Sequence, residues 1–291
     1  MLSKSFLGIL FLLLYTLALD AKSILYKVTS DKSAVYVLGS IHLAKPELYP
    51  LDKAIEQAYK NSDILVVELD AESQESMMAI QSAMVHLGMY QNGKSLKTEL
   101  SSQTYKQLQA YTVKTGLPLQ MLEQMRPWVV MLQLSVMEMM RLGYSPELGI
   151  DKHFLDKAKR DNKPILEIES AEEQMALLSR DDNKFQDLML RYTLESMHEM
   201  EPLLGKMFTS WKEGDAKELA TVVDSSMVVD PRLTEIYDEL ITKRNYKMAK
   251  TIQGYLKTRK NYFVVVGAGH VIGEEGIVGL LEKRGYKVVQ K

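Results

Sequence analysis

The sequence predicts an α/β protein: a central mixed sheet made of two similar halves, with a large and mainly helical insertion between them. The two halves share one pattern, in which an apolar strand runs into glycine, two further residues and histidine. This pattern occurs as YVLGSIH, ending at His42, and as VVVGAGH, ending at His270. Between them, from about residue 72 to 255, apolar residues recur mostly at helical spacing. We interpret the halves as a pseudo-repeat.

The first half of the predicted sheet lies before residue 72. Two short apolar stretches, residues 24–28 and 34–38, predict strands joined by a polar turn. Residues 51–60 predict an amphipathic helix, because their apolar side chains recur every three or four positions. The run ILVVEL at residues 64–69 then predicts a buried strand.

The second half repeats this order at the end of the chain. The run at residues 262–266 predicts a buried strand, and a following helix is capped by Gly285 before a last strand at residues 286–289. Within the insertion, residues 163–169 predict a further strand. Ser170 and Glu173 then stand at the spacing of a capping box, which predicts the start of a helix.

The composition limits the possible partners and cofactors. The chain has 291 residues, and its 36 basic residues are interleaved with 38 acidic ones, for a net charge of -2. We therefore expect no nucleic-acid partner, since nucleic-acid binding needs clustered positive charge. The chain has no cysteine, so any metal ion must be held by histidine, carboxylate or backbone oxygen.

The first 21 residues predict a secretory signal peptide. Lys4 precedes an uncharged apolar run at residues 6–18, and Ala18 and Ala21 are small residues at which a peptidase could cleave. The run is shorter than the roughly 20 residues that span a membrane. We expect residues 22–291 to form one exported domain, periplasmic or extracellular, with no stable membrane insertion after cleavage. A retained N-terminal anchor is the alternative.

Three potential metal ligands stand at predicted strand ends, where open α/β sheets bind their ligands. They are His42, Glu68 and His270, and glycines beside the histidines allow close backbone approach. Two imidazoles and a carboxylate suit a divalent metal such as zinc, manganese or cobalt. The alternative interpretation is that each histidine only fills a turn.

Three further residues are candidates for supporting roles. Arg244 falls on the apolar face of a helix predicted over residues 233–255, so it needs a partner, which is a substrate carboxylate or an oxyanion. An internal salt bridge, or a side chain that extends its charged end to solvent, is the alternative. Asp151 at a helix start and Glu169 at a strand end are candidates for orienting an imidazole from behind. Helix capping or simple solvation would equally explain these two carboxylates.

Seven short motifs make the sequence resemble the TraB/GumN family, which is related to the TIKI-type metalloproteases. In chain order they are GSIH (39–42), VVELD (66–70), RPW (126–128), LGID (148–151), IESAEEQ (168–174), KRN (243–245) and VGAGH (266–270). The resemblance covers nearly the whole chain after the predicted signal. It implies a metal-dependent peptidase that relies on paired GxxH motifs, a glutamate and an arginine. On this chain those residues are His42, His270, Glu68 and Arg244.

The leading hypothesis is therefore a secreted, metal-dependent hydrolase acting on a peptide or protein substrate. His42, His270 and Glu68 would hold the metal, Arg244 would stabilise the developing oxyanion, and Glu68 could instead serve as the general base. A non-catalytic protein that sequesters a peptide or ligand on the same fold is the alternative. Haem binding, with either GxxH histidine as axial ligand, is a third hypothesis.

Overall fold

The computed structural model of the chain describes residues 23–180, 182–227, 234 and 237–291. The predicted signal peptide, residues 1–21, lies outside the described residues. No helix in these described ranges is both long enough and apolar enough to cross a membrane.

The described residues form a six-stranded mixed sheet with the order β4-β3-β5-β2-β1-β6. Neighbouring strands among β4, β3, β5 and β2 are parallel, whereas β1 pairs antiparallel with both β2 and β6. The carboxyl ends of the four parallel strands therefore meet along one edge. The strands are β1 (Leu25–Thr29), β2 (Ala34–Ser40), β3 (Ile64–Val67), β4 (Ile165–Glu167), β5 (Tyr262–Gly267) and β6 (Lys287–Gln290).

Helices occupy most of the chain between β3 and β5. Before them come η1 (Pro46–Leu48) and α1 (Lys53–Lys60). The segment itself holds α2 (Gln74–His86), α3 (Leu96–Glu99), α4 (Ser102–Thr115), η2 (Leu119–Met121), α5 (Pro127–Arg141), η3 (Pro146–Leu148), α6 (Ile150–Asp161), α7 (Ala171–Leu178), α8 (Asn183–Ser196), η4 (Met197–Glu199), α9 (Met200–Glu213), α10 (Ala216–Met227), η5 (Asp238–Thr242) and α12 (Lys243–Tyr255). After β5 follow α13 (Ala268–Val271) and α14 (Ile277–Lys283).

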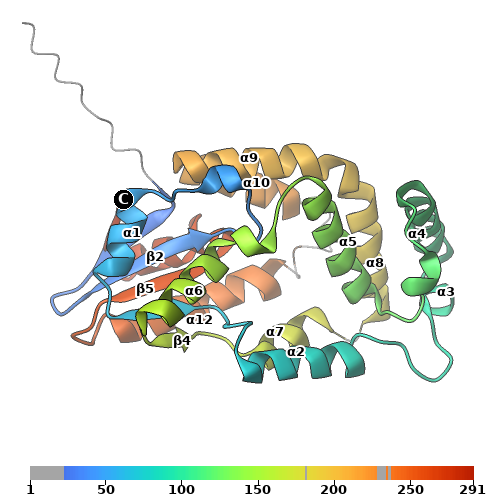
Figure 1. Cartoon of the computed structure of the whole chain (residues 1–291), viewed down its shortest axis with the longest axis horizontal. Coiled ribbons are helices and arrows are strands. Elements are labelled where there is room, and N and C mark those ends of the chain that lie inside the picture. Colours follow the sequence, from blue (N-terminus) through green and yellow to red (C-terminus); the bar gives the residue numbers. More distant parts are fainter. Residues whose placement is uncertain (1–22, 181, 228–233, 235–236) are drawn as a thin grey trace, which may run out of the picture.

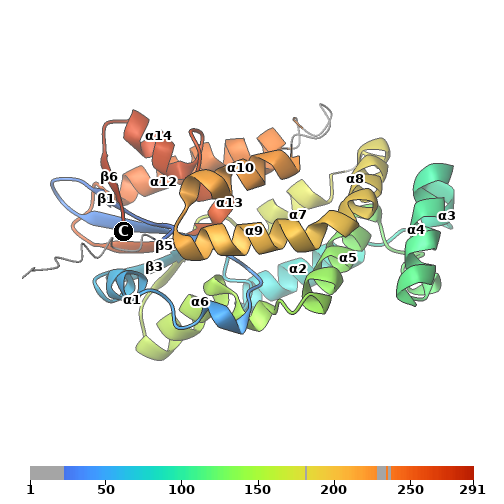
Figure 2. The same cartoon turned by 90° about the horizontal axis from the view of Figure 1, so that it is seen from above.

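The sheet lies between two helical layers. Figure 2 shows α12 and α14 on one side of it and α1 and α6 on the other. One hydrophobic core joins these layers, with Phe154 of α6 and Phe263 of β5 among its fully buried side chains. A second core lies within the helical segment, contains no residue of the sheet and includes Leu108 of α4 and Leu134 of α5. Figure 1 shows α3 and α4 at the end of the molecule farthest from the sheet.

The predicted strands and most predicted helix boundaries are confirmed to within about two residues. Ser170 and Glu173 form the expected capping box at the start of α7, and Gly285 follows α14 with a positive φ of 85°. The helix predicted over residues 233–255 is only partly described. Residues 234 and 237 are helical, and the chain then forms a π-helical turn, η5, and continues as α12.

The two similar sequence motifs take different conformations. Gly267 caps α13, so that His270 lies within a short helix and is buried. The chain after β2 instead continues as a loop, in which His42 is exposed. The strands that follow also differ, because β3 is parallel to β5 within the sheet whereas β6 is antiparallel to β1 at its edge. The two GxxH motifs therefore have similar residues and lie at the same edge of the sheet, but their backbone conformations differ.

The close approach of β2 to its neighbours gives a stability prediction. A Cβ on Gly39 would lie 2.6 Å from Ile24 Cγ2 and 3.0 Å from the Ala268 backbone. We expect Gly39→Ala to lower the free energy of unfolding by about 2 kcal/mol, because the packed sheet cannot shift to admit the methyl group. Urea unfolding followed by circular dichroism measures the change.

A matched control is available in α9, where a Cβ on Gly205 would meet nothing within 4 Å. Gly205→Ala should be neutral or stabilise the protein by up to about 1 kcal/mol, because alanine favours the helix. Equal effects of the two substitutions would contradict the packing argument.

Candidate active site

A row of polar side chains lies along the edge where the four parallel strands end. In sheet order, Glu169 follows β4, Glu68 follows β3, Gly267 ends β5 and Ser40 ends β2. The strand ladders continue to this edge, since the Glu169 N–H donates to the Glu68 carbonyl at 2.9 Å and Ser40 stands in register with Gly267. Residues far apart in the sequence are thus brought side by side by strand register.

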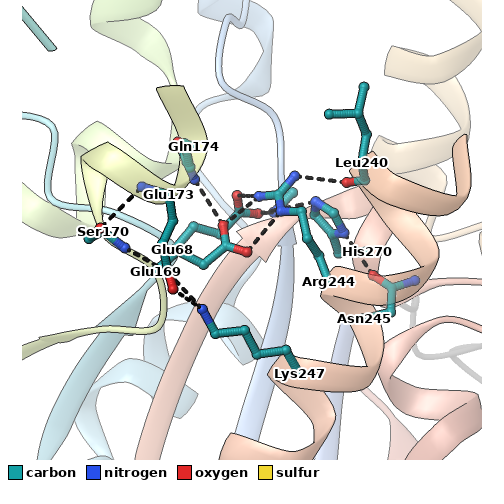
Figure 3. A network of polar contacts seen from close by, with 11 residues as sticks. Glu68, Glu169, Ser170, Glu173, Gln174, Leu240, Arg244, Asn245, Lys247 and His270 are labelled. Atoms are coloured by element: carbon teal, nitrogen blue, oxygen red, sulfur yellow. Dashed lines mark hydrogen bonds and ion pairs between the residues drawn. The ribbon is translucent and has the colours of Figure 1, made fainter. Parts of the chain in front are cut away.

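Arg244 of α12 joins the two carboxylates of this row. Its Nε and Nη2 donate to the two carboxylate oxygens of Glu169 at 2.8 and 2.7 Å, and Nη2 also donates to Glu68 Oε2 at 3.0 Å. Figure 3 shows the guanidinium facing both carboxylates. Burial alone would raise the pKa of Glu169, but the hydrogen bonds and charge of Arg244 outweigh it and lower that pKa. Both acids are therefore held together as a charged cluster in a buried place.

The contacts of Arg244 leave little of it free for a substrate. Its Nη1 donates to the Leu240 carbonyl at 2.9 Å, within the π-helical turn η5. With the three bonds to carboxylates, four of the five guanidinium N–H groups are used within the described residues. One N–H on Nη1 remains for another partner. The main role of Arg244 in this structure is to hold Glu68 and Glu169 in place.

His270 is held in one tautomer by Asn245. The Asn245 amide nitrogen donates to the Glu275 carbonyl at 2.8 Å, so its oxygen faces His270 Nδ1 at 2.7 Å and must accept a proton from it. The unprotonated Nε2 then points toward Glu68, with 4.0 Å between Nε2 and Oε1. Burial lowers the pKa of His270. The ring is therefore neutral, with a free lone pair on the side of the row.

His42 is held in the same manner from the other side, by Asp151. Its Nδ1 lies 2.8 Å from Asp151 Oδ2, and the Ser40 hydroxyl donates to Asp151 Oδ1 at 2.9 Å. The Asp151 carboxylate raises the pKa of His42 to about 9 through its charge and its hydrogen bond. The His42 side chain is 61% exposed, against 7% for His270. His42 is thus the histidine of the pair that a ligand can reach from solvent.

The start of α6 is docked on the His42 loop, and this places Asp151. The Ile150 N–H donates to the Ile41 carbonyl at 3.0 Å. A Cβ on Gly149 would overlap the His42 carbonyl, so only glycine permits this approach.

Gly267 lies at the centre of the potential ligands. Its N–H donates to Glu68 Oε1 at 2.5 Å. A Cβ built on Gly267 would be 3.3 Å from Glu68 Oε1, 3.6 Å from His42 Nε2 and 3.6 Å from His270 Cδ2. The absence of a side chain therefore leaves a small space that Glu68 and both imidazoles border.

The donor chemistry around this space fits a divalent metal. Both imidazoles are held through Nδ1, which leaves each Nε2 as the potential ligand, and such support from a second residue is typical of metal-binding histidines. The groups are not, however, gathered as a ready metal site: in the described part of the chain, no three His, Asp or Glu residues stand in a metal-holding arrangement. Binding would require the side chains to close around the ion.

The structure brings together the four main residues singled out in the sequence, namely His42, Glu68, Arg244 and His270. Asp151 orients an imidazole, as the hypothesis for it describes. Glu169 contacts Arg244 and Gln174 rather than a histidine, so the internal-carboxylate alternative for Arg244 describes the observed contacts.

Asn245 belongs to the site but is not among the candidate residues that the sequence indicated. It is buried on the same face of α12 as Met248, Ala249 and Ile252, at helical spacing. The signal that pointed to Arg244, a polar residue on an apolar stripe, would also have found it.

The fold and this cluster define an α/β protein with a polar candidate active site at the carboxyl edge of its parallel strands. The chain belongs to the TraB/PrgY/gumN family, whose model matches residues 24–290. No solved structure matches the chain significantly.

Individual relatives are similar at low identity. An uncharacterized protein of Escherichia coli, YbaP, is 26% identical over 246 residues, which cover 84% of this chain and 87% of that protein. Metalloprotease TIKI2 of Danio rerio is 24% identical over 87% of this chain, and metalloprotease TIKI1 of Homo sapiens is 22% identical over 92%. The matches span only 57% and 62% of the lengths of these two relatives.

The His42–Asp151 pair gives a titration prediction for the metal-free protein. We expect a His42 pKa of about 9 by NMR, against an ordinary value of 6.5. Asp151→Asn should return it toward 6.5, because it removes the negative charge but keeps a hydrogen-bonding side chain. His270, held by Asn245, is the internal control and should keep its lowered pKa. An unchanged His42 pKa in the variant would contradict this assignment.

The same shift sets the sign of a stability change with pH. Because folding raises the pKa of His42 from 6.5 to about 9, the pair stabilises the fold fully below pH 6.5. This contribution is lost as the pH rises through about 9. Denaturant unfolding of the wild-type protein and of Asp151→Asn at pH 6.5 and at about pH 9 measures this contribution to the free energy of unfolding.

Proposed function

We propose that the protein is a metal-dependent hydrolase that cleaves peptide bonds at the carboxyl edge of its sheet. The observation that carries this proposal is that His42 and His270 are both held through Nδ1, which turns the Nε2 side of each ring toward the space that Glu68 borders. Family membership and the similarity to proteins named metalloproteases support the reaction class. The predicted export of the chain belongs to the same proposal.

His42, His270 and Glu68 are the residues that would hold the metal. When bound there, a divalent ion such as zinc, manganese or cobalt would supply Lewis-acid activation of water and of the scissile carbonyl. The exposure of His42 provides a route for the ion and the substrate, while the buried His270 keeps its neutral, ligating form without needing to lose a proton.

The remaining chemistry falls to the carboxylates and Arg244. Glu68 accepts the proton of the attacking water if it does not serve as a ligand, and its Oε1 is oriented by the Gly267 N–H at 2.5 Å. Arg244 fixes the position of Glu68 by donating to its Oε2 at 3.0 Å. The remaining Nη1 N–H of Arg244 can donate to one substrate oxygen. Glu169 fixes the guanidinium through its two hydrogen bonds.

Metal content tests the proposed ligand set directly. We expect the purified wild-type protein, loaded with zinc, manganese or cobalt and dialysed, to retain about one ion per chain. The double variant His42→Ala/His270→Ala should retain almost none, since it loses both imidazoles. Elemental analysis measures the metal content, and incubation with a peptide library measures peptide cleavage by each protein.

The matched control is His198→Ala, which removes an exposed histidine on η4. It should bind metal and cleave peptides as wild type does. Retention of metal by the double variant, or equal cleavage by His42→Ala and wild type, would refute the proposed site.

Arg244→Lys tests whether the guanidinium geometry matters beyond its charge. We expect kcat to fall about a hundredfold with metal content unchanged, because lysine cannot contact both carboxylates and the Leu240 carbonyl together. The same swap at Arg141, which is exposed and paired with Glu138 in α5, is the control and should leave kcat unchanged. Steady-state kinetics with one cleaved peptide measures kcat for both variants. A wild-type kcat in Arg244→Lys would refute a role for the guanidinium geometry.

A further inference from the structure

The edge of the sheet opposite the candidate active site is formed by a set of neighbouring loops. Strand register brings these loops together, because β2, β3, β4, β5 and β6 all begin at this edge. Figure 1 shows the β1–β2 hairpin and the loop before β5 at the left end of the view. We call this surface the amino edge, and it consists of residues 30–33, 60–63, 161–164, 256–261 and 284–287.

The amino edge carries a concentrated positive charge. Its residues include eight basic and three acidic side chains, which give a net charge of +5 in a chain whose total is -2. Six of the basic residues are exposed, and within the described residues their charged groups pair with no acid. These six are Lys32, Lys60, Lys257, Arg259, Lys260 and Lys287. The other two, Lys163 and Arg284, donate to uncharged oxygens. The charges that are interleaved along the sequence are therefore separated on the folded surface.

Hydrogen bonds join the loops of the amino edge to one another. Asn261 lies at the centre of this network, since its Oδ1 accepts from the Ala34 N–H at 2.9 Å and its own N–H donates to Asp63 Oδ2 at 2.8 Å. The Ser30 hydroxyl of the β1–β2 hairpin donates to the Leu256 carbonyl at 2.7 Å. The backbone that carries the basic side chains is therefore held in place before any partner binds.

The ends of helices account for part of this charge but not for all of it. The helices α1, α6, α12 and α14 end at the amino edge, and basic side chains near a helix C-terminus offset the negative end of its dipole. This explains Lys60, which ends α1. Lys32 and Lys287 instead belong to the β1–β2 hairpin and to β6, and Arg259 and Lys260 lie beyond the last turn of α12. Helix stabilisation does not require these four residues.

The chemistry of the amino edge fits an extended anionic surface better than a compact anion or a nucleic acid. Within the described residues no helix begins there, so the edge offers no helix N-terminus for a bound phosphate. Six of its eight basic residues are lysine, whose point charge suits headgroups in many orientations, whereas arginine is preferred for fixed contacts to nucleic-acid phosphates. The predicted signal peptide would also bring the chain to a membrane.

We propose that the amino edge docks the protein on a membrane surface that carries anionic lipids. The contact is peripheral and electrostatic, and each basic residue close to such a surface strengthens binding about fivefold. Docking leaves the candidate active site facing away from the lipid, because the site lies at the other end of the strands. For the seven residues of β2 this separation is roughly 20 Å. The inference goes beyond the proposed function and does not depend on it.

Binding to lipid vesicles tests this proposal. The protein is purified as the expressing cells process it, and mass spectrometry verifies that all variants have the same N-terminus. We expect vesicles of phosphatidylcholine with one-third phosphatidylglycerol to bind it at least about a hundredfold more strongly than phosphatidylcholine alone. This preference should disappear as the salt concentration rises from about 0.1 to about 1 M, since the Debye length falls from about 10 to about 3 Å. Lipid titration with vesicle flotation measures the partition coefficient.

Charge reversal in the loop before β5 locates the contact. We expect the triple variant Lys257→Glu/Arg259→Glu/Lys260→Glu to bind the anionic vesicles at least about a hundredfold more weakly than wild type, because three attractive charges become repulsive. Its metal content and its cleavage of a soluble peptide should equal those of wild type, since the substitutions lie at the edge away from the candidate active site.

The matched control reverses three exposed lysines on α3 and α4, at the other end of the molecule in Figure 1, namely Lys97, Lys106 and Lys114. This control changes the net charge by the same amount. It should bind the anionic vesicles within about threefold of wild type, because its charges lie farther from the membrane than a Debye length. Circular dichroism verifies that both triple variants are folded.

Three results would overturn the proposal. They are equal binding to the two kinds of vesicle, equal loss of binding in the two triple variants, and tighter binding to duplex DNA than to anionic vesicles at the same phosphate concentration. The last result would assign the amino edge to nucleic acid. None of the three bears on peptide cleavage, and a protein that binds anionic vesicles but cleaves no peptide would refute the proposed peptidase while supporting the docking surface.

Discussion

The organisation of the site depends on the ion-pair cluster of Arg244 with Glu68 and Glu169. Two carboxylates at the ends of adjacent parallel strands repel each other, and burial makes this repulsion stronger. Arg244 balances them by donating to both. Because Arg244 comes from α12, this cluster also ties the helical segment to the sheet. The π-helical turn before it supplies the Leu240 carbonyl that completes the set of contacts.

The two histidines show how similar motifs acquire different properties. His270 is buried, neutral and held by an uncharged amide, whereas His42 is exposed and held by a carboxylate that favours its charged form. Each partner fixes the ring through Nδ1 and leaves Nε2 toward the space beside Gly267. The two rings therefore differ in protonation, because burial lowers the pKa of His270 whereas Asp151 raises the pKa of His42 to about 9.

The second hydrophobic core gives the helical segment a packing centre separate from the sheet. An apolar cavity lies where helices of this segment, α5 and α8, meet α7 and η5, which contact the polar cluster. The helical segment therefore meets the polar residues at the sheet edge through α7 and η5.

The sequence by itself determined the strands, a few helix boundaries, the family and the four main candidate residues, because buried strands, capping boxes and GxxH motifs are local patterns. Only the tertiary structure decided which of these residues contact one another. Strand order placed β5 between β3 and β2, which put Gly267 between Glu68 and His42. The tertiary structure also decided that Arg244 pairs with Glu169 and that Asn245 holds His270 by a hydrogen bond. These contacts join positions from 25 to 176 residues apart, and no local pattern encodes pairings at such separation.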